Sequence, residues 1–415
     1  MLLSKNKNLF SPDYWPSYYR SAKGCTVTDL DGNDFIDFAS NGIGACSLGF
    51  SNDEIDDFVI NTIRHGVMSS LNCPAEVDLA KTLCRLHPWA EMAKFARSGG
   101  EANAISIRIA RAASGKDKVA FCGYHGWHDW YLAANISTED TLASHLLDGL
   151  GSRGVPKNLQ NSVIPLRYNN FDDLSVLMDD NEIGVVKLEP TRSCLPAPGY
   201  LEKIREICDI KDIVLIFDEC TSGFRQAYGG VHLNFDVFPD LCILGKALGN
   251  GYAITAILGT KKIMSYANET FISSTFWTEA IGSNAALKTL EVMKRTLSWE
   301  QLPVLGYQVK EIWRKAAIDN DIQIVIEGLD ALPTFKFAGA HSSALKTAFT
   351  ELMLDQGFLA TTQFYPSTSH NENTLNQYRL SLNNVFSKLS SIQDSQVQQL
   401  LCRGKLCKPS FKRLN

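Results

Sequence analysis

Two residues in the middle of the chain could place an acid and an amine around one ligand. Asp218 directly follows the apolar run 213–217, and Lys246 follows the apolar run 241–244 after a single glycine. Short apolar runs bounded by polar residues predict buried parallel strands. In open α/β sheets, ligands bind at the C-terminal ends of such strands. We therefore expect the carboxylate and the lysine to face one ligand from two sides.

This pair suits pyridoxal phosphate (PLP), which needs an amine for a Schiff base and an acid that keeps its pyridine nitrogen protonated. Two alternatives exist. An acidic pair after an apolar strand, here Asp218 and Glu219, also binds magnesium in nucleotide hydrolases, and Gly-Lys is a fragment of a P-loop. A P-loop needs Ser or Thr after its lysine, whereas Ala247 follows Lys246. Taken alone, a lysine at a strand end is usually an exposed cap, so the interpretation depends on the accompanying motifs.

The length and composition indicate a globular protein with more than one core. A chain of 415 residues predicts a large domain and a smaller one. Its hydrophobic fraction of 45% and charged fraction of 20% are typical of globular proteins, and a net charge of −5 provides no attraction for nucleic acid. No stretch approaches about eighteen uncharged apolar residues, so we expect no membrane span.

The cysteines and the N-terminus favour a cytoplasmic protein. Eleven cysteines are scattered through the chain without C-x-x-C or zinc-like spacing, and several lie inside apolar runs. They are typical of reduced core residues. Residues 1–8 lack the apolar segment of a signal peptide.

A candidate anion site lies in residues 98–102, Ser-Gly-Gly-Glu-Ala, where a strand-like run ends and a helix begins. The amides of Gly99 and Gly100 at the start of that helix would suit a phosphate. Taken alone, Ser-Gly-Gly is more often an ordinary loop. The apolar face of the predicted helix consists of Ala102, Ile105, Ile109 and Ala112.

An aromatic loop follows the predicted strand 118–122 and reads Gly123-Tyr-His-Gly-Trp-His-Asp-Trp-Tyr131. His125 and His128 could suggest a metal site, but no carboxylate–cysteine cluster lies nearby in the sequence. A stacking surface for a flat heterocycle fits the four aromatic rings better. We therefore expect no metal.

The remaining patterns of the first 300 residues predict an α/β scaffold. Residues 132–165 are polar and weakly periodic, which predicts a long loop. The predicted elements are a hairpin over 24–38, two helices between 51 and 89, strands at 183–188 and 253–258, and a helix at 200–210. In the two early helices, the predicted buried residues are Ile55, Phe58 and Val59, then Val77, Ala80, Leu83 and Cys84.

Beyond about residue 300 the pattern changes to that of an α+β domain. A long helix is predicted over 305–318, followed by short strands at 322–326 and 334–337 and by later helices. The basic segment 403–413 is typical of a solvated terminus, and we assign it no function.

Several motifs together follow the order and spacing of one family. They are Ser98-Gly-Gly-Glu-Ala102, Gly123-Tyr-His-Gly126, Glu189-Pro190, Phe217-Asp-Glu219 with Gly223-Phe-Arg225, Pro239-Asp240, Gly245-Lys246 and Thr275. On these motifs the chain resembles the class III, fold type I PLP aminotransferases, most closely the glutamate-1-semialdehyde aminomutase branch. The similarity covers nearly the whole chain.

The resemblance implies an α/β fold like that of aspartate aminotransferase. Its large PLP-binding domain, with a mostly parallel sheet, would span residues 51–295. A smaller α+β domain would combine residues 1–50 with residues 296–415.

The same resemblance implies roles for individual residues. Lys246 would form the Schiff base and move the proton, and Asp218 would pair with the pyridine nitrogen. Thr275 would reach the phosphate of the neighbouring subunit, so a homodimer with shared active sites is expected. The implied catalytic residues are thus Lys246 and Asp218. The full cofactor-binding set is Gly99, Gly100, Tyr124, His125, Glu189, Asp218, Cys220, Lys246 and Thr275.

The chain departs from the family at three of its expected contacts. Cys220 stands where the family usually has valine under the ring, and Gly100 where it usually has threonine. Cys194 stands where the branch commonly has an asparagine near the cofactor's O3′. We expect ring packing and phosphate contacts to differ at these positions.

The function implied is a PLP-dependent aminotransferase that moves an amino group from an amino donor to a carbonyl-bearing small molecule. The alternative is an intramolecular aminomutase. Segments 126–131 and 276–279 differ from the mutase pattern, which favours a transaminase, and their aromatic and polar groups suggest a polyhydroxylated acceptor such as a keto-sugar. Binding of PLP without catalysis is disfavoured because Lys246 and Asp218 are both present.

Overall fold

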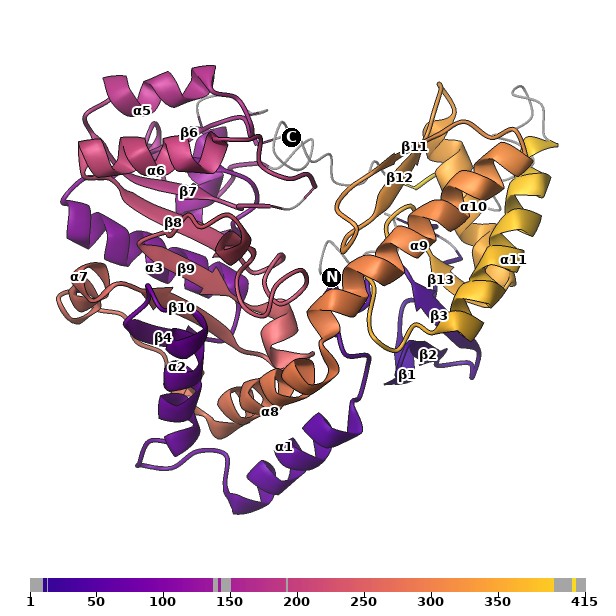
Figure 1. Ribbon diagram of the computed structural model, residues 1–415, viewed down its shortest axis with the longest axis horizontal. Helices are drawn as coiled ribbons and strands as arrows, with labels where there is room; N and C mark the ends of the chain where they lie inside the picture. The colour runs from indigo at the N-terminus through magenta and orange to yellow at the C-terminus, as the bar shows by residue number, and fades with distance from the viewer. Residues whose placement is uncertain are drawn as a thin grey trace. The chain divides into compact units, whose positions relative to one another are not determined.

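A sheet of mostly parallel strands forms the centre of residues 54–295 in the computed structural model. Seven strands of the described chain lie in the order β4-β10-β9-β8-β7-β5-β6 (Figure 1). Those from β9 to β6 run parallel, while β10 runs antiparallel to both β9 and β4. Their bounds are β4 (Met92–Ala96), β5 (Lys118–Cys122), β6 (Val163–Pro165), β7 (Ile183–Leu188), β8 (Val214–Glu219), β9 (Leu241–Leu244) and β10 (Thr255–Gly259).

The structure describes residues 10–12, 14–136, 141–142, 151–191, 193–391 and 405–407. Residues 54–295 make one compact unit, and the described residues before and after that span make a second. No described helix is long and apolar enough to cross a membrane. Most of the basic segment 403–413 lies outside the described residues.

The buried apolar runs of the sequence correctly predict the inner strands. Every residue of β7, β8 and β9 is buried, as expected for parallel strands covered on both faces. In the β8–β9 ladder, Asp218 lies opposite Ile243 and Glu219 opposite Leu244. The polar residues that follow these strands therefore leave the sheet at the same edge.

The prediction of one long loop over residues 132–165 is wrong in its described part. It contains two short 3-10 helices, η3 (Ala133–Asn135) and η4 (Lys157–Leu159), and the edge strand β6, which pairs with β5. A strand of three residues is too short to show a period of two, so only its partner strand defines it. Residues 137–140 and 143–150 of this segment lie outside the described residues.

Helices cover both faces of the sheet (Figure 1). Helix α3 (Gly99–Ser114) packs on one face, and α5 (Ser175–Asp179) with α6 (Tyr200–Lys211) packs on the other. The predicted residues Ala102, Ile105 and Ile109 are buried, but Ala112 is exposed. Ser106 lies near the middle of the buried face of α3. Ala112 lies roughly 120° from Ser106 around the helix axis, which places it beyond the edge of that face.

The two early helices are present, with a narrower buried stripe than predicted. Helix α1 (Asp53–His65) buries Ile55 and Val59, and α2 (Pro74–Leu86) buries residues spaced by four, including Leu83. Phe58 and Val77 are 39% and 55% exposed, so their predicted burial is wrong. Each lies beside its stripe rather than in it. Ala80 and Cys84 are only half-buried.

The other helices of this unit are short, except for the last. They are α4 (Asp129–Leu132), η5 (Asp172–Leu174), η6 (Val231–Asn234), η7 (Lys246–Gly249), α7 (Lys261–Met264), η8 (Ser265–Asn268), η9 (Thr275–Thr278) and α8 (Ala280–Thr296).

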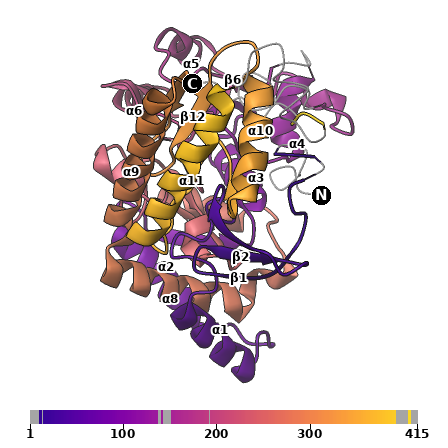
Figure 2. The same cartoon turned by 90° about the vertical axis from the view of Figure 1, so that its right-hand side faces the viewer.

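The second unit combines the two ends of the chain. The predicted hairpin is present as β2 (Thr26–Asp29) and β3 (Asp34–Phe38), flanked by β1 (Tyr19–Lys23) and by β13 (Phe358–Ala360), which pairs parallel to β3. A separate ladder joins β11 (Ile324–Glu327) to β12 (Thr334–Phe337). Helix α11 (Glu372–Ser390) lies between α9 (Ser298–Asp319) and α10 (Ser342–Asp355) (Figure 2).

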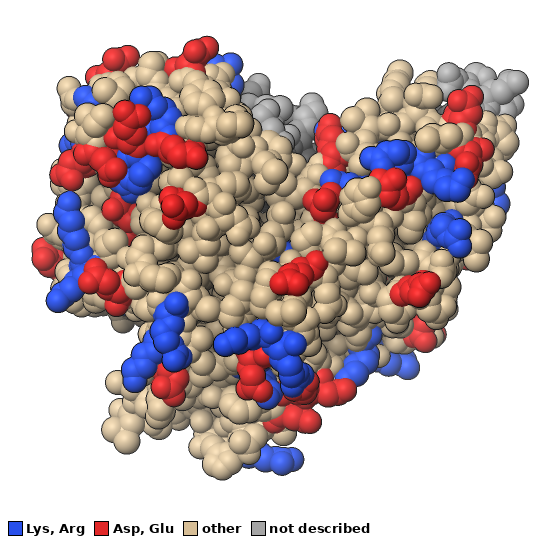
Figure 3. All heavy atoms as spheres, in the orientation of Figure 1, with Lys and Arg blue, Asp and Glu red and all other residues tan. Residues whose placement is uncertain are grey.

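The core of this second unit is rich in aromatic residues. Trp313, Phe335, Phe349, Tyr378 and Phe386 are all buried, and the Trp313 indole donates a hydrogen bond to the Tyr378 hydroxyl at 2.9 Å. On the surface, Lys and Arg side chains are interspersed with Asp and Glu over the face drawn in Figure 3.

Candidate active site

The predicted acid and amine follow two adjacent parallel strands. Asp218 is the penultimate residue of β8, and Lys246 comes two residues after the end of β9. The Lys246 backbone has a φ of 44°, in the left-handed region, and its Nζ donates to Thr221 Oγ1 at 2.6 Å. Placement of the two groups at neighbouring strand ends is therefore confirmed.

Cys220 lies where the anion loop, residues 98–102, approaches the loop that carries Lys246. A Cβ atom added to Gly99 would be 3.4 Å from Cys220 Sγ, and one added to Gly245 would be 3.2 Å from it. Burial, followed by the charge of Asp218, raises the pKa of the Cys220 thiol well above its ordinary value. The thiol thus stays neutral. Its sulfur lies between the anion loop, the end of β8 that carries Asp218, and the loop that carries Lys246.

Asp218 is buried and ionised. Burial by itself would raise its pKa, but the hydrogen bond and charge of His125, together with the charge of Lys187, hold the pKa well below the ordinary value. Its Oδ2 lies 2.9 Å from His125 Nδ1, and its Oδ1 accepts from the Cys220 amide at 3.1 Å. A carboxylate fixed in this way is suited to hold a positively charged nitrogen.

Both ring nitrogens of the buried His125 face acceptors. Nδ1 faces the Asp218 carboxylate, and Nε2 lies 3.0 Å from the carbonyl oxygen of Cys122. A carbonyl oxygen only accepts, so Nε2 is the donor in that contact, and Nδ1 faces the carboxylate. His125 thus positions Asp218 from within the core. His128 stacks on Trp127, and no contact recorded in the described chain joins its ring to Asp218.

The start of α3 leaves two amides available. Ser98 Oγ accepts from the Glu101 amide, and the Glu101 carboxylate accepts from the Ser98 amide, which completes a capping box. No acceptor within the described residues is recorded for the amides of Gly99 and Gly100. These groups fit a phosphate, because amides at a helix N-terminus attract anions.

Gly100 is closely covered by the aromatic loop. A Cβ atom at this position would lie 2.7 Å from His128 Cε1 and 3.6 Å from Trp127 Nε1. A Cβ atom on Gly126 would in turn lie 3.1 Å from Gly100 Cα. The rings of this loop fill the space of a threonine side chain, which accounts for glycine where the family usually has threonine.

Glu189 anchors the loop that carries Tyr124. It is 7% exposed, and its Oε2 accepts from the Tyr124 amide at 3.0 Å. Gly123 has a φ of 106°, and a Cβ atom there would lie 2.7 Å from the same oxygen. The ends of β5 and β7 are thus joined beside the position of Tyr124.

Thr275 stands apart from the other predicted site residues. It is exposed at the start of η9, and the described chain records no contact between it and them. Arg97 ties the following segment to the start of the anion loop, since its side chain donates to the carbonyl oxygens of Phe276 and Trp277, both at 2.9 Å.

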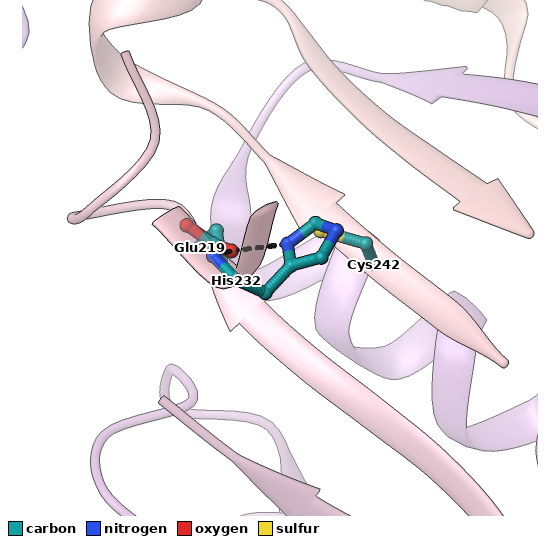
Figure 4. A group of neighbouring side chains, drawn as sticks. All are labelled: Glu219, His232 and Cys242. Carbon is teal, nitrogen blue, oxygen red and sulfur yellow. Dashed lines mark hydrogen bonds and ion pairs between the residues drawn. The ribbon is translucent and has the colours of Figure 1, made fainter. Parts of the chain in front are cut away.

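Glu219, His232 and Cys242 form a buried cluster whose ligand-type atoms lie within 4.8 Å of one another (Figure 4). The Glu219 carboxylate faces His232 Nδ1 at 2.5 Å, and His232 Nε2 accepts from the Trp89 indole at 2.9 Å. Further donors to this carboxylate are Ser222 Oγ at 2.9 Å and the amides of Val231 at 2.6 Å and His232 at 3.0 Å. Burial raises the pKa of Cys242 well above its ordinary value. The ligand atoms of Glu219 and His232 are occupied by hydrogen bonds, and the Cys242 thiol keeps its proton. The cluster therefore supports the end of β8 and does not suit a metal.

Sequence patterns do not single out Thr221, Lys187 or the partners of Glu219. Thr221 lies in the turn directly after β8, so its position beside two functional strand ends is the one available signal. The other contacts join segments far apart in the chain.

Residues 11–361 match the family model of the class III aminotransferases. The chain belongs to the class III aminotransferases. This membership confirms the predicted enzyme class, a PLP-dependent aminotransferase, and its cofactor.

Two curated relatives of this class III aminotransferase carry different activities in their names. The 3-aminobutyryl-CoA aminotransferase of Cloacimonas acidaminovorans (strain Evry) is 33% identical over 84% of each chain. A glutamate-1-semialdehyde 2,1-aminomutase of Methanosphaera stadtmanae is 31% identical over 90% of this chain and 93% of its own.

A solved structure confirms the predicted fold type I architecture. The PLP internal aldimine form of the Sphingopyxis sp. MTA144 FumI protein superposes with a TM-score of 0.85 at 22% identity, covering 96% of both chains. The residues of this class III aminotransferase fit the cofactor at the groups described above: two available amides, a buried carboxylate and a lysine.

Proposed function

We propose that this class III aminotransferase transfers an amino group from an amino donor to the carbonyl of a separate small molecule, with PLP attached at Lys246. The observation that carries the proposal is the position of Cys220, in contact range of both Gly99 and Gly245 and adjacent to Asp218. One location thus offers groups for the phosphate, the ring nitrogen and the carbonyl carbon of PLP.

Bound PLP supplies an electron sink for the substrate carbon that loses its proton. Lys246 would hold the cofactor through its amine, and the same amine would move the proton at that carbon. Thr221 Oγ1 accepts from Lys246 Nζ and keeps the amine directed to one place. Asp218, oriented by His125, keeps the ring nitrogen protonated.

The remaining predicted residues would hold the cofactor. The amides of Gly99 and Gly100 would bind the phosphate, and Tyr124 would lie against one face of the ring. Glu189 would act through its hydrogen bond to the Tyr124 amide. Cys220 would pack under the ring as a neutral thiol.

We further propose a polar acceptor, such as a keto-sugar. His128 Nδ1, Trp130 Nε1 and Trp277 Nε1 are buried and have no hydrogen-bond partner among the described residues. They lie in or next to the two segments that differ from the aminomutase pattern. Buried polar atoms of this kind are usually hydrogen-bonded, so hydroxyl groups of a bound substrate would serve as their partners.

The second candidate is an intramolecular aminomutase, which the name of the Methanosphaera relative favours. The two functions differ in the number of substrates. Donors and acceptors can be screened by the absorbance of the bound cofactor. In a transaminase, a donor decreases this absorbance and a separate acceptor restores it. Turnover of one amino-carbonyl compound without a second substrate would establish the mutase, and no change with any donor would refute both.

We propose a homodimer with shared active sites. Large apolar side chains near Thr275 are exposed in the single chain, with Phe271 84% and Phe276 65% exposed, and Leu71 is 83% exposed. Exposed apolar patches commonly mark association surfaces. Light scattering coupled to size-exclusion chromatography would give twice the mass of one chain; a monomer carrying full activity would refute shared sites.

The domain assignment and location complete the proposal. Residues 51–295 would form the large PLP-binding domain, and residues 1–50 with 296–415 the small one. All cysteines of the described chain are free, which supports a reducing, cytoplasmic compartment.

A further inference from the structure

Lys187 is a fully buried lysine inside the central sheet. It lies within β7, where all six residues are buried, and it is 0% exposed. In register it stands between Phe121 of β5 and Ile216 of β8. Burial of an ammonium group in such surroundings is costly unless an opposite charge is near, so an apolar residue would suit this position better for packing alone.

The carboxylate that acts most strongly on the charge of Lys187 is that of Asp218. Side chains alternate between the two faces of a strand, so Lys187, Ile216 and Asp218 project from the same face of the sheet. Asp218 lies two residues beyond Ile216, which makes it the diagonal neighbour of Lys187 toward the edge that carries the active site. It is also the strongest charge that acts on Lys187.

One hydrogen bond to Lys187 is recorded in the described chain. Its Nζ donates to Ser106 Oγ of α3 at 3.1 Å, and the Ser106 hydroxyl donates its own hydrogen bond to the carbonyl oxygen of Asn103. An ammonium group has three donors, so this environment satisfies it incompletely.

Burial therefore lowers the pKa of Lys187 to about 8, against the opposing charge of Asp218. The other titratable groups that act on Lys187 are Cys220, Cys242 and Glu189. The thiols of Cys220 and Cys242 are neutral, because burial raises the pKa of each. Asp218 is thus the main charge that stabilises the ammonium form of Lys187.

We propose that Lys187 is a positioning residue for the amino-transfer reaction, whose positive charge, held by Ser106, sets how strongly Asp218 favours a proton on the cofactor. The inference rests on the proposed role of Asp218. His125 holds the Asp218 carboxylate through a hydrogen bond, whereas Lys187 acts on it as a nearby charge. A positive charge there opposes protonation of bound PLP, so it lowers the pH at which the absorbance of the bound cofactor changes.

The test compares the charge of Lys187 with its volume. Lys187→Met removes the charge and keeps a long apolar side chain, and Ile216→Met is the control on the same face in the adjacent strand. Each protein is loaded with PLP, and the absorption band of the bound cofactor is titrated against pH. In Lys187→Met the midpoint should rise by about one pH unit, as expected for removal of one nearby charge at an effective dielectric constant near 20. Ile216→Met should titrate like the natural protein.

Ser106→Ala provides a second measurement that does not depend on the folding of Lys187→Met. Loss of the acceptor favours the neutral amine of Lys187, so the midpoint should rise in the same direction by a smaller amount. Unchanged midpoints in the folded variants would overturn the role of Lys187 while leaving the proposed function intact. Failure of the natural protein to form a PLP absorption band would instead refute the proposed function.

Discussion

The Nδ1 atom of His125 lies 2.9 Å from the Asp218 carboxylate, while its Nε2 lies 3.0 Å from the carbonyl oxygen of Cys122. The ring thus bridges the carboxylate and a backbone carbonyl group within the core. The carboxylate is therefore paired inside the protein on one side and remains available to a cationic ring nitrogen on the other. This arrangement makes the ionised form of Asp218 the feature that mutation should test first.

Asp218→Asn should keep covalent PLP at Lys246 and lose roughly 10²–10³-fold in turnover, the usual effect of removing one electrostatic contact of a transition state. An amide cannot hold the positive charge on the pyridine nitrogen. Steady-state kinetics and the absorbance of the loaded protein measure the two effects separately. Asp209→Asn, at an exposed residue, is the control. Turnover within a few-fold of the natural protein would exclude Asp218 as the partner of the nitrogen.

Lys246→Ala should abolish turnover and leave weak, non-covalent PLP binding, because the amides of Gly99 and Gly100 and the Asp218 carboxylate remain. Equilibrium dialysis gives the affinity, and borohydride treatment followed by mass spectrometry detects covalent attachment. Lys262→Ala, at a lysine that is 79% exposed, should retain both properties. Near-normal turnover in Lys246→Ala would contradict the assignment.

Thr275→Ala should weaken PLP binding by roughly tenfold or more, since a hydrogen bond to a charged group contributes about 1.5–3 kcal/mol. No hydroxyl from position 100 can compensate, because that residue is glycine. Fluorescence titration with PLP measures the loss. The spectrum of the cofactor that remains bound should not change.

A mixed dimer decides which subunit uses Thr275. One subunit carries Lys246→Ala and the other Thr275→Ala, and two affinity tags isolate the mixed species. With shared sites, the site that keeps Lys246 receives an intact Thr275 from its partner, so about half of the natural activity returns, as symmetry requires. A mixed dimer whose Lys246-bearing site binds PLP as weakly as Thr275→Ala would show that Thr275 serves its own subunit.

Gly100→Thr should introduce a clash, because its Cβ atom would lie 2.7 Å from His128 Cε1. Overpacking of this kind lowers the free energy of unfolding by about 1–3 kcal/mol. It should also weaken PLP binding, both effects being measured by denaturant unfolding and cofactor titration. Adding His128→Ala removes the ring and should restore both quantities. Tighter PLP binding in Gly100→Thr alone would contradict the predicted clash, since it would show that the aromatic loop moves to make room for the threonine side chain.

His87 should make stability depend on pH. Burial lowers its pKa from 6.5 to about 4 in the folded protein, where Nε2 accepts from the Gly230 amide at 3.0 Å. Between these two values the unfolded chain binds the extra proton, so the contribution of His87 to stability is complete above pH 6.5 and falls as the pH drops toward 4. The slope should approach about 1.4 kcal/mol per pH unit. His87→Gln should reduce this slope in denaturant unfolding; an equal slope in both proteins would contradict the assignment.

The inner strands are predictable because burial on both faces leaves a continuous apolar run. The run 241–244 coincides with β9, and the run 183–188 with β7. The edge strand β6 has three residues and too little pattern of its own. Phe58 and Val77 are apolar on helices whose buried stripes are narrow, so residue type alone overestimates their burial.

The site divides in the same way. Asp218 and Lys246 are predictable because each lies at or just beyond the end of a buried apolar run, so local sequence determines where it emerges. The covering of Gly100 by His128 and the contact between Lys187 and Ser106 each join separate elements. Such contacts depend on how helices and loops pack on the sheet, and no periodicity encodes them.

The order of pairing also determines when these surfaces close during synthesis on the ribosome. Strand β4 emerges early, yet its neighbour in the sheet, β10, consists of Thr255–Gly259. The hairpin at the N-terminus gains its last partner strand later still, because β3 pairs with Phe358–Ala360 near the other end of the chain. Pairings this distant along a chain form slowly and leave strand edges open to other molecules. The nascent chain should therefore need protection by a chaperone until its last domain-forming strand is released.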